Sequence, residues 1–222
     1  IKELSFETMM EFFPGFSMEQ CIEAYAVLGG IPGLWAHFND KISVRENICR
    51  YILGKNAFLN REGQRIMEEE LRETGVYNTI LASIAAGKHK LNELYLHTDF
   101  SRAKISVYLK NLMELELVEK IFSYDTEGKA NTQKGIYRIK NHFVHFYFTY
   151  LYPNLSSLEQ LAPDQFYKRY IAPYFKSYVA EYFKTVCRQH VEKLDKWGRL
   201  PVEIDRMGEW VGKLGTIDVI AQ

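Results

Sequence analysis

Side chains able to donate hydrogen bonds to phosphates and base edges are concentrated between residues 101 and 134 of this chain. The first group lies on the outward face of one predicted helix and comprises Ser101, Arg102, Lys104, Ser106, Tyr108 and Lys110. The second group lies in a polar segment and comprises Lys129, Asn131, Gln133 and Lys134. Side chains of these types make most protein contacts to the DNA backbone, and arginine and lysine also read guanine in the major groove. The pattern is typical of a helix and a loop that contact duplex DNA.

The elements that would position these side chains follow from the spacing of the apolar residues. Helical spacing predicts three helices, and alternation predicts two strands after them, at residues 76–86, 91–96, 102–117, 118–124 and 135–139. Gly87 is expected to end the first helix, because glycine tolerates the left-handed conformation found there. The polar residues 125–134 form the loop of the predicted hairpin. Three helices followed by a hairpin predict a winged helix-turn-helix over residues 76–140.

The charge balance leaves two interpretations of this unit open. The whole chain has 28 basic and 28 acidic residues, so its formal net charge at pH 7 is zero. Residues 76–140 contain ten Lys and Arg residues against seven acids, a surplus of three. Any nucleic-acid site must therefore be a local patch. The unit either binds DNA or is a winged helix that contacts protein and has a solvated charged face.

The flanking regions are predicted to be mainly helical. Ser17 and Gln20 have the spacing of a capping box at the start of a helix. Residues 29–33 are rich in glycine but lack the lysine and hydroxyl residue of a phosphate-binding loop, which favours a tight turn between helices. Aromatic residues crowd 143–152 and are expected to form core rather than to stack on bases. Two strands are predicted near the end, at 200–207 and 216–221.

Composition restricts the class of protein further. Three widely separated cysteines, Cys21, Cys49 and Cys187, argue against a disulfide framework and favour a reducing, cytoplasmic setting. No apolar run reaches the length of a membrane span, so no membrane partner is expected. His142 and His145 have the spacing of a metal-binding pair, but no acid or cysteine lies near them. The chain lacks a starting methionine and ends inside a strand-like run, which indicates a piece of a longer protein.

Three segments resemble the C-terminal half of the archaeal-type AAA ATPases. The segment Tyr25-Ala-Val-Leu-Gly-Gly-Ile-Pro-Gly-Leu-Trp35 is similar to the family's LGG-P-Y turn in the helical lid. The segment Gly135-Ile-Tyr-Arg-Ile-Lys-Asn-His-Phe143, with the aromatics after it, is similar to the family's segment behind the wing. Gly208-Glu-Trp-Val-Gly-Lys-Leu-Gly-Thr-Ile-Asp-Val-Ile220 resembles its G-x-W-W-x-x-x-x-E-I-D-V-V segment. Val211 and Thr216 depart from the family's usual Trp and Glu.

This resemblance implies an ATP site upstream of these residues, since no Walker motif or arginine finger lies within them. It also implies that the C-terminal region resembles a restriction endonuclease. In that fold carboxylates hold a Mg²⁺ ion, and Glu181 and Asp218 match two of them by position. The remaining E-x-K pair would lie beyond Gln222. A carboxylate inside an apolar strand is costly to bury alone, so Asp218 is expected to have a partner or a metal ion. The alternative is that Asp218 is a hydrogen-bonded structural residue in a nuclease-like fold that has lost its catalytic activity.

Together these features predict a mainly α fold: a helical lid-like domain (1–75), a winged helix-turn-helix (76–140), and a helical linker with a truncated α/β nuclease-like domain (141–222). The predicted function is that of a non-catalytic C-terminal fragment of an AAA-type ATPase that binds double-stranded DNA. No cofactor is expected in this fragment, whereas ATP and Mg²⁺ are implied for the parent protein. The upstream ATPase domain and a homo-oligomer are further expected partners. The alternatives are a Mg²⁺-dependent nuclease-like domain and a winged helix used for protein contact.

Overall fold

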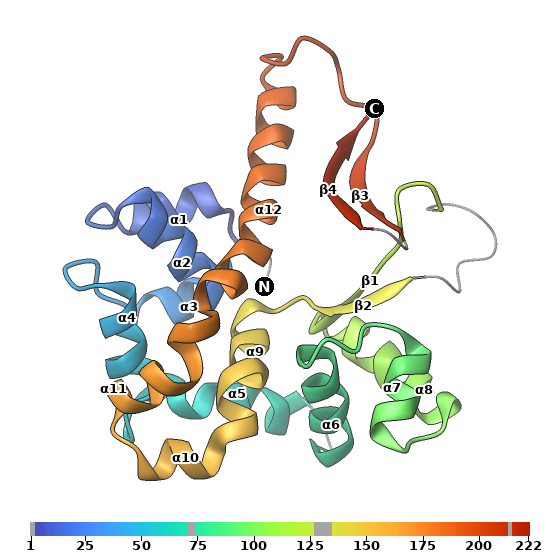
Figure 1. Ribbon diagram of the computed structural model, residues 1–222. Coiled ribbons are helices and arrows are strands. Elements are labelled where there is room, and N and C mark those ends of the chain that lie inside the picture. Colours follow the sequence, from blue (N-terminus) through green and yellow to red (C-terminus); the bar gives the residue numbers. More distant parts are fainter. Residues whose placement is uncertain (1–2, 71–73, 127–134, 213–214) are drawn as a thin grey trace.

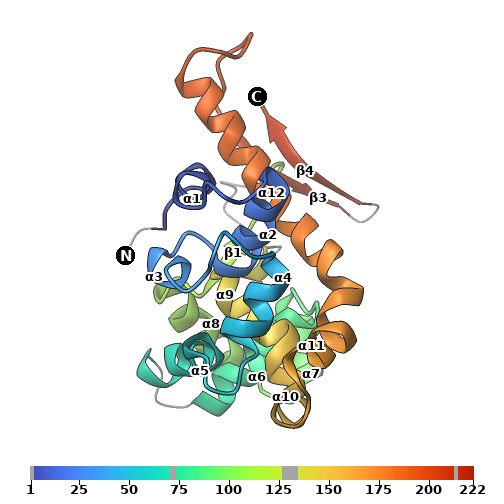
Figure 2. The ribbon, with the colours of Figure 1, turned by 90° about the vertical axis from the view of Figure 1, so that its left-hand side faces the viewer.

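The computed structural model describes residues 3–70, 74–126, 135–212 and 215–222, and it shows a mainly helical chain with two small sheets (Figure 1). Each sheet has two antiparallel strands. A long helix, α12, runs from the body of the molecule and has the second sheet, β3–β4, beside it (Figures 1 and 2). None of the helices in these ranges combines the length and the apolar character that a membrane span requires.

The first part of the chain forms a cluster of short helices. They are α1 (Phe6–Phe12), α2 (Met18–Leu28), α3 (Pro32–Trp35), α4 (Val44–Asn47), the π-helical segment η1 (Ile48–Ile52) and α5 (Phe58–Glu70). The capping box at Ser17 and Gln20 is confirmed, with both of its hydrogen bonds formed. Gly29 ends α2 with a φ of 61°, a conformation that favours glycine, and Trp35 Nε1 donates to the Gly29 carbonyl over 2.7 Å. The glycine-rich segment is therefore a tight turn between helices, as the sequence predicts.

The middle of the chain contains three helices followed by a hairpin. They are α6 (Thr74–Ala85), α7 (Leu91–Thr98), α8 (Arg102–Glu114), β1 (Val118–Ile121) and β2 (Ile136–Ile139), and the strands pair from Val118 with Ile139 to Ile121 with Ile136. Gly87, with a φ of 85°, follows α6 as predicted. The third helix ends three residues earlier than predicted. Leu115 caps it and Glu116 has a φ of 58°, so the chain reverses before Leu117 and begins the strand.

The last part of the chain holds most of the aromatic core. Its elements are α9 (His142–Phe146), the π-helical η2 (Tyr147–Leu151), the 3₁₀ segment η3 (Tyr152–Asn154), α10 (Leu155–Gln160), α11 (Pro163–Phe166), the π-helical η4 (Tyr167–Ile171), α12 (Ala172–Lys196), β3 (Met207–Val211) and β4 (Thr216–Ala221). Phe143, Phe146 and Phe148 are fully buried. The core interpretation of this aromatic segment is therefore confirmed, because rings buried in this way cannot stack on bases.

The first of the two predicted C-terminal strands is wrong in position. Residues 200–206 are not strand, and β3 instead occupies Met207–Val211, which overlaps the predicted strand only at Met207. The strand forms there because this segment finds pairing partners on both sides: β4, and Tyr124, whose N–H donates to the Glu209 carbonyl over 2.7 Å. Between the pairs Gly208–Ile220 and Trp210–Ile217, Glu209 faces two residues of β4, Asp218 and Val219. Such a bulge re-aims the side chains beside it.

Helix α12 joins the N-terminal helices to the centre of the molecule. The buried Tyr178 hydroxyl donates to the carbonyls of Ala26 and His142, each over 3.2 Å. Farther along the helix, Gln189 donates to the Tyr25 hydroxyl and its amide oxygen accepts from the Phe6 N–H, both over 3.0 Å. Each pairing satisfies a polar group that packing removes from water. The N-terminal helices, α9 and α12 therefore share one core.

Candidate nucleic-acid interface and the adjoining polar cleft

The outward face of α8 is the surface on which the predicted DNA-contacting residues lie. Arg102, Ser106 and Lys110 are exposed at spacings of one helical turn, while Ile105, Leu109 and Leu112 are buried on the opposite face. Ser101 is also exposed, and its hydroxyl caps the helix by accepting from the Lys104 N–H over 3.2 Å. The structure therefore brings four of the predicted residues to one end and one side of a single helix.

Arg102 is held in place by the preceding helix. Its guanidinium donates to the Asn92 side-chain oxygen over 2.6 Å and lies over the Tyr95 ring, 3.9 Å from the ring centre. Both partners belong to α7, and Arg102 remains exposed. Local sequence could not reveal these contacts, since they depend on how α7 packs against α8. The consequence is a cation whose position is fixed before any ligand arrives.

Lys104 and Tyr108 are less available than the sequence predicts. Lys104 is half-buried, with its ammonium over the rings of Phe100 and Tyr108. Tyr108 is also half-buried, and its ring packs against Tyr77 with 4.6 Å between ring centres. Because Lys104 packs over these rings, reversing its charge is expected to disturb packing as well as charge. Lys129 and Lys134, with Asn131 and Gln133, lie outside the described residues.

Two apolar side chains interrupt the polar surface of the helix pair. Leu96 on α7 is 70% exposed and Val107 on α8 is 57% exposed. Val107 follows Ser106 on the outward face of the helix. Lys110 contacts the carboxylate of Glu114, one turn later, at 3.7 Å, which offsets part of its charge. The surface is thus of mixed character, with few strong cations and an apolar component.

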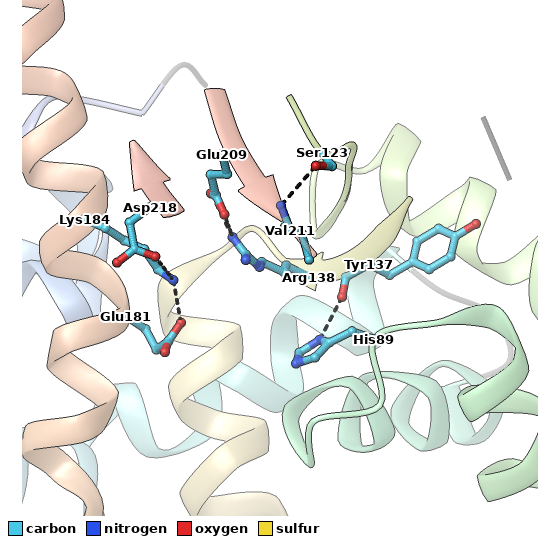
Figure 3. A network of polar contacts seen from close by, with 9 residues as sticks. All are labelled: His89, Ser123, Tyr137, Arg138, Glu181, Lys184, Glu209, Val211 and Asp218. Carbon is cyan, nitrogen blue, oxygen red and sulfur yellow. Dashed lines mark hydrogen bonds and ion pairs between the residues drawn. The ribbon is translucent and has the colours of Figure 1, made fainter. Parts of the chain in front are cut away.

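A polar cleft of about 700 Å³ lies between β2, β3 and α12, beside this unit. Figure 3 shows its contacts, which come from segments distant in the sequence. One Arg138 guanidinium nitrogen on β2 donates to both carboxylate oxygens of Glu209 on β3, over 2.7 and 2.9 Å. The Val211 N–H donates to the Ser123 hydroxyl over 3.0 Å, and the His89 ring contacts the Tyr137 carbonyl at 3.0 Å. The β3–β4 sheet is therefore fastened to the hairpin mainly by polar contacts.

The predicted metal ligands are Glu181, which lines this cleft, and Asp218, and the two share a lysine (Figure 3). The Lys184 ammonium lies 3.1 Å from a Glu181 carboxylate oxygen and 3.5 Å from one of Asp218. Asp218 therefore has an ionic partner, and it is not a carboxylate buried alone, since its side chain is 57% exposed. The bulge in β4 occurs at this residue. Among the residues that the structure describes, no three metal-ligating side chains gather at one point.

The Arg138–Glu209 pair should account for much of the attachment of the β3–β4 sheet. Its side chains are only 24% and 11% exposed, so water replaces the pairing poorly. We expect Glu209→Gln and Arg138→Gln each to lower the free energy of unfolding by about 1–3 kcal/mol. The double variant should lose less than the sum, with a coupling energy of about 1–2 kcal/mol, in urea titrations. Additive losses would contradict this role for the pair.

Two histidines line the cleft: His142 is buried and His145 is half-buried. His142 Nδ1 is 2.7 Å from the Tyr25 carbonyl, so this nitrogen carries the proton, because a carbonyl only accepts. His145 Nδ1 is 2.6 Å from the Tyr182 hydroxyl. Burial lowers the pKa of each histidine from 6.5 to about 4. Both rings are therefore neutral at pH 7, and among the described residues neither belongs to a group of three side chains that could hold a metal ion.

Comparisons with known proteins give one family match in the C-terminal region and one relative aligned over the whole chain. Residues 147–222 match the DUF234 family, described as archaea bacterial proteins of unknown function. The whole chain is 32% identical, over 228 aligned residues, to an uncharacterized protein of Methanocaldococcus jannaschii. The alignment covers 100% of this chain but 49% of that relative, so the chain spans about half the length of the curated relative it matches. No solved structure matches this chain.

The structure adds residues to the candidate site that sequence reasoning missed. Arg138, Lys184 and Glu209 make its closest ion pairs, yet none of them is among the site residues that the sequence predicts. Arg138 and Glu209 are 71 residues apart, and nothing in the spacing of either segment relates the two. The available signal was chemical: an arginine and a glutamate on short strands with otherwise apolar neighbours each need a partner when packed.

Proposed function

We propose that this chain is the non-catalytic C-terminal part of an AAA-type ATPase and that it binds duplex DNA through a winged helix-turn-helix. The observation that carries the proposal is the outward face of α8, where the fixed guanidinium of Arg102, the Ser106 hydroxyl and the Lys110 ammonium are exposed together. A recognition helix presents such donors from its first turns to the major groove, while phosphate contacts fix its register.

The arrangement of the surrounding elements supports a winged helix. Helices α6, α7 and α8 pack on one another, and the antiparallel strands β1 and β2 follow directly. In this arrangement α8 is the recognition helix and the β1–β2 hairpin is the wing. The wing would contact the backbone beside the groove, through the loop that contains Lys129 and Lys134.

Two observations support a parent ATPase: three segments resemble the C-terminal half of AAA ATPases, and the chain covers 49% of its relative. In the structure, the glycine turn of the first segment ends α2, and the last segment forms most of β3 and β4. ATP and Mg²⁺ would be bound by an ATPase domain outside these residues, which is then the partner of the described helices. The role proposed for this chain is to couple DNA contact to that domain.

Duplex DNA should bind with strong salt dependence. Four to six phosphate contacts imply a slope of log K against log salt of roughly −4 to −5. Replacing Ser106 and Lys110 with glutamate should weaken binding roughly 100-fold, because two carboxylates would face the phosphates and one cation would be lost. Both positions are exposed, so thermal unfolding should change little. Fluorescence anisotropy with a labelled duplex measures the affinity.

The matched control is Lys176→Glu, an exposed lysine on α12 whose reversal should leave DNA affinity nearly unchanged. Equal binding by the Ser106→Glu/Lys110→Glu protein would contradict the proposal. The alternative is then protein contact through the same helix pair, which the exposure of Leu96 and Val107 favours. On that alternative, Leu96→Ser with Val107→Ser would weaken association with the protein partner, whereas it should leave a DNA affinity based on phosphate contacts largely intact.

A further inference from the structure

Helices α5 and α10 lie at the end of the molecule away from the β3–β4 sheet (Figures 1 and 2). Residues of both helices line a second open groove. Its volume is about 750 Å³, and its walls come from the end of η1, from α5, from η2 and from α10. The lining residues are Leu53, Lys55, Asn60, Arg61, Arg65, Tyr147, Leu155, Leu158 and Glu159. The groove shares no residue with the polar cleft or with α8, so the proposed DNA interface does not account for it.

The floor of the groove is apolar and closely packed. Leu53, Tyr147 and Leu158 are buried beneath it, while Leu155 is 41% exposed at its edge. Gly63 permits this arrangement, because a Cβ at that position would come within 2.5 Å of the Tyr147 ring. Helix α5 therefore lies directly against Tyr147, and its Arg61 and Arg65 stand at the wall of the groove. The groove therefore exposes an apolar edge at Leu155, above a floor of largely buried apolar side chains, with cations beside it.

The rim of the groove has an excess of positive charge. Lys55, Arg61 and Arg65 line it against a single carboxylate, Glu159. Arg65 makes two hydrogen bonds to the Glu62 carboxylate, over 2.6 and 2.9 Å. Lys55 and Arg61 are exposed, and within the part of the chain that the structure describes neither makes an ion pair. Two cations at the rim are therefore available to pair with an anionic partner.

We propose that this groove docks an acidic, amphipathic segment of a partner protein. Such a segment would lay leucine-type side chains on the floor and direct carboxylates toward Lys55 and Arg61. An open groove of this kind cannot enclose most of a small ligand's surface, as small-molecule sites do. Single-stranded nucleic acid fits less well, because it stacks on exposed aromatic rings and Tyr147 is only 4% exposed. Charge complementarity and the apolar floor together select an acidic peptide.

The proposal is tested with a labelled peptide and the whole chain. The probe is a peptide of about 14 residues with leucines at helical spacing and glutamates between them, and its counterpart has lysines in place of glutamates. The acidic peptide should bind saturably and the basic one should not. Lys55→Glu with Arg61→Glu should weaken binding roughly tenfold or more, and Leu155→Ser should weaken it several-fold. Fluorescence anisotropy at two salt concentrations measures both effects.

The controls separate the groove from general electrostatics and from misfolding. Lys176→Glu removes the same charge from an exposed site outside the groove and should leave binding unchanged. Circular dichroism during heating should show that the exposed-site variants remain folded. Absence of saturable binding, equal binding of the basic peptide, or unchanged affinity in the Lys55→Glu/Arg61→Glu variant would overturn the proposal. So would self-association of the chain that the same variant abolishes without any binding of the acidic peptide, since the occupant would then be a second copy.

Discussion

Lowering the pH from 6.5 to about 4 is expected to remove about 3 kcal/mol of stability through His142 alone. Burial lowers the pKa of this histidine from 6.5 to about 4 in the folded chain, and the hydrogen bond to the Tyr25 carbonyl only partly opposes the shift. Below pH 6.5 the unfolded chain therefore takes up the proton more readily than the folded one. The stabilisation is complete above pH 6.5 and is lost progressively as the pH falls toward 4. Urea unfolding across this range measures the loss.

His145 should act in the same direction, because burial also lowers its pKa to about 4. Burial has the opposite consequence for Glu3, Glu23 and Glu119, because it raises the pKa of each carboxyl. The folded chain then takes up these protons at a higher pH than the unfolded chain, which adds stability as the pH falls. The His142 contribution is isolated by comparing the wild type with His142→Gln, whose amide can still donate to Tyr25 but cannot titrate. The variant should lose about 3 kcal/mol less across the same range. An NMR titration of the wild type that gives His142 a pKa near 6.5 would contradict the prediction without any variant.

Trp35→Ala should lower the free energy of unfolding by about 3–5 kcal/mol. The ring is 1% exposed, packs near Phe12 with 5.6 Å between ring centres, and donates to the Gly29 carbonyl. Truncation would leave a large cavity and an unpaired carbonyl in the turn that links α2 to α3. Since α2 packs against α9 and α12, the loss should lower the midpoint of the single unfolding transition. Thermal and urea unfolding measure this effect.

Trp197 provides the matched control for this substitution. It is 53% exposed and lies beneath the charged groups of Lys193 and Arg199. Trp197→Ala should therefore cost no more than about 1 kcal/mol. Trp35→Phe should fall between the two, because it keeps most of the buried ring but leaves the Gly29 carbonyl unpaired. Equal losses for the two alanine variants would show that Trp35 is not a core residue.

The limits of the sequence are clearest at the candidate DNA interface. Helical spacing correctly separated the inward face of α8 from its outward face, since burial of one stripe follows from the 3.6-residue period. It could not show that Lys104 lies over two aromatic rings, or that Asn92 and Tyr95 hold Arg102. These contacts depend on the angle and depth at which α7 packs against α8. Helical period alone does not specify either quantity.

In the C-terminal region, too, some features could be predicted from the sequence and others depend on packing. The sequence correctly predicted the position of β4 and that Asp218 would have a partner. It placed β3 several residues too early in the chain. Strand position depends on which neighbouring backbone supplies hydrogen bonds, and here that neighbour includes Tyr124, far earlier in the chain. The partner of Asp218 proved to be Lys184, a residue of the long helix. A charge pattern within the strand could indicate the need for a partner but could not identify it.

The features that could be predicted from the sequence are those that depend on residues within about two helical turns. These include the capping box at Ser17, the helix ends at Gly29 and Gly87, the order of three helices and a hairpin, and the burial of the aromatic segment. Three features depend on the packing of distant elements: which cations stay exposed, the position of Lys184 between Glu181 and Asp218, and the pairing of Arg138 with Glu209. The physical reason is that a local pattern fixes the direction of a side chain from its own element. The partner that it meets is set by the packing of elements far apart in the chain.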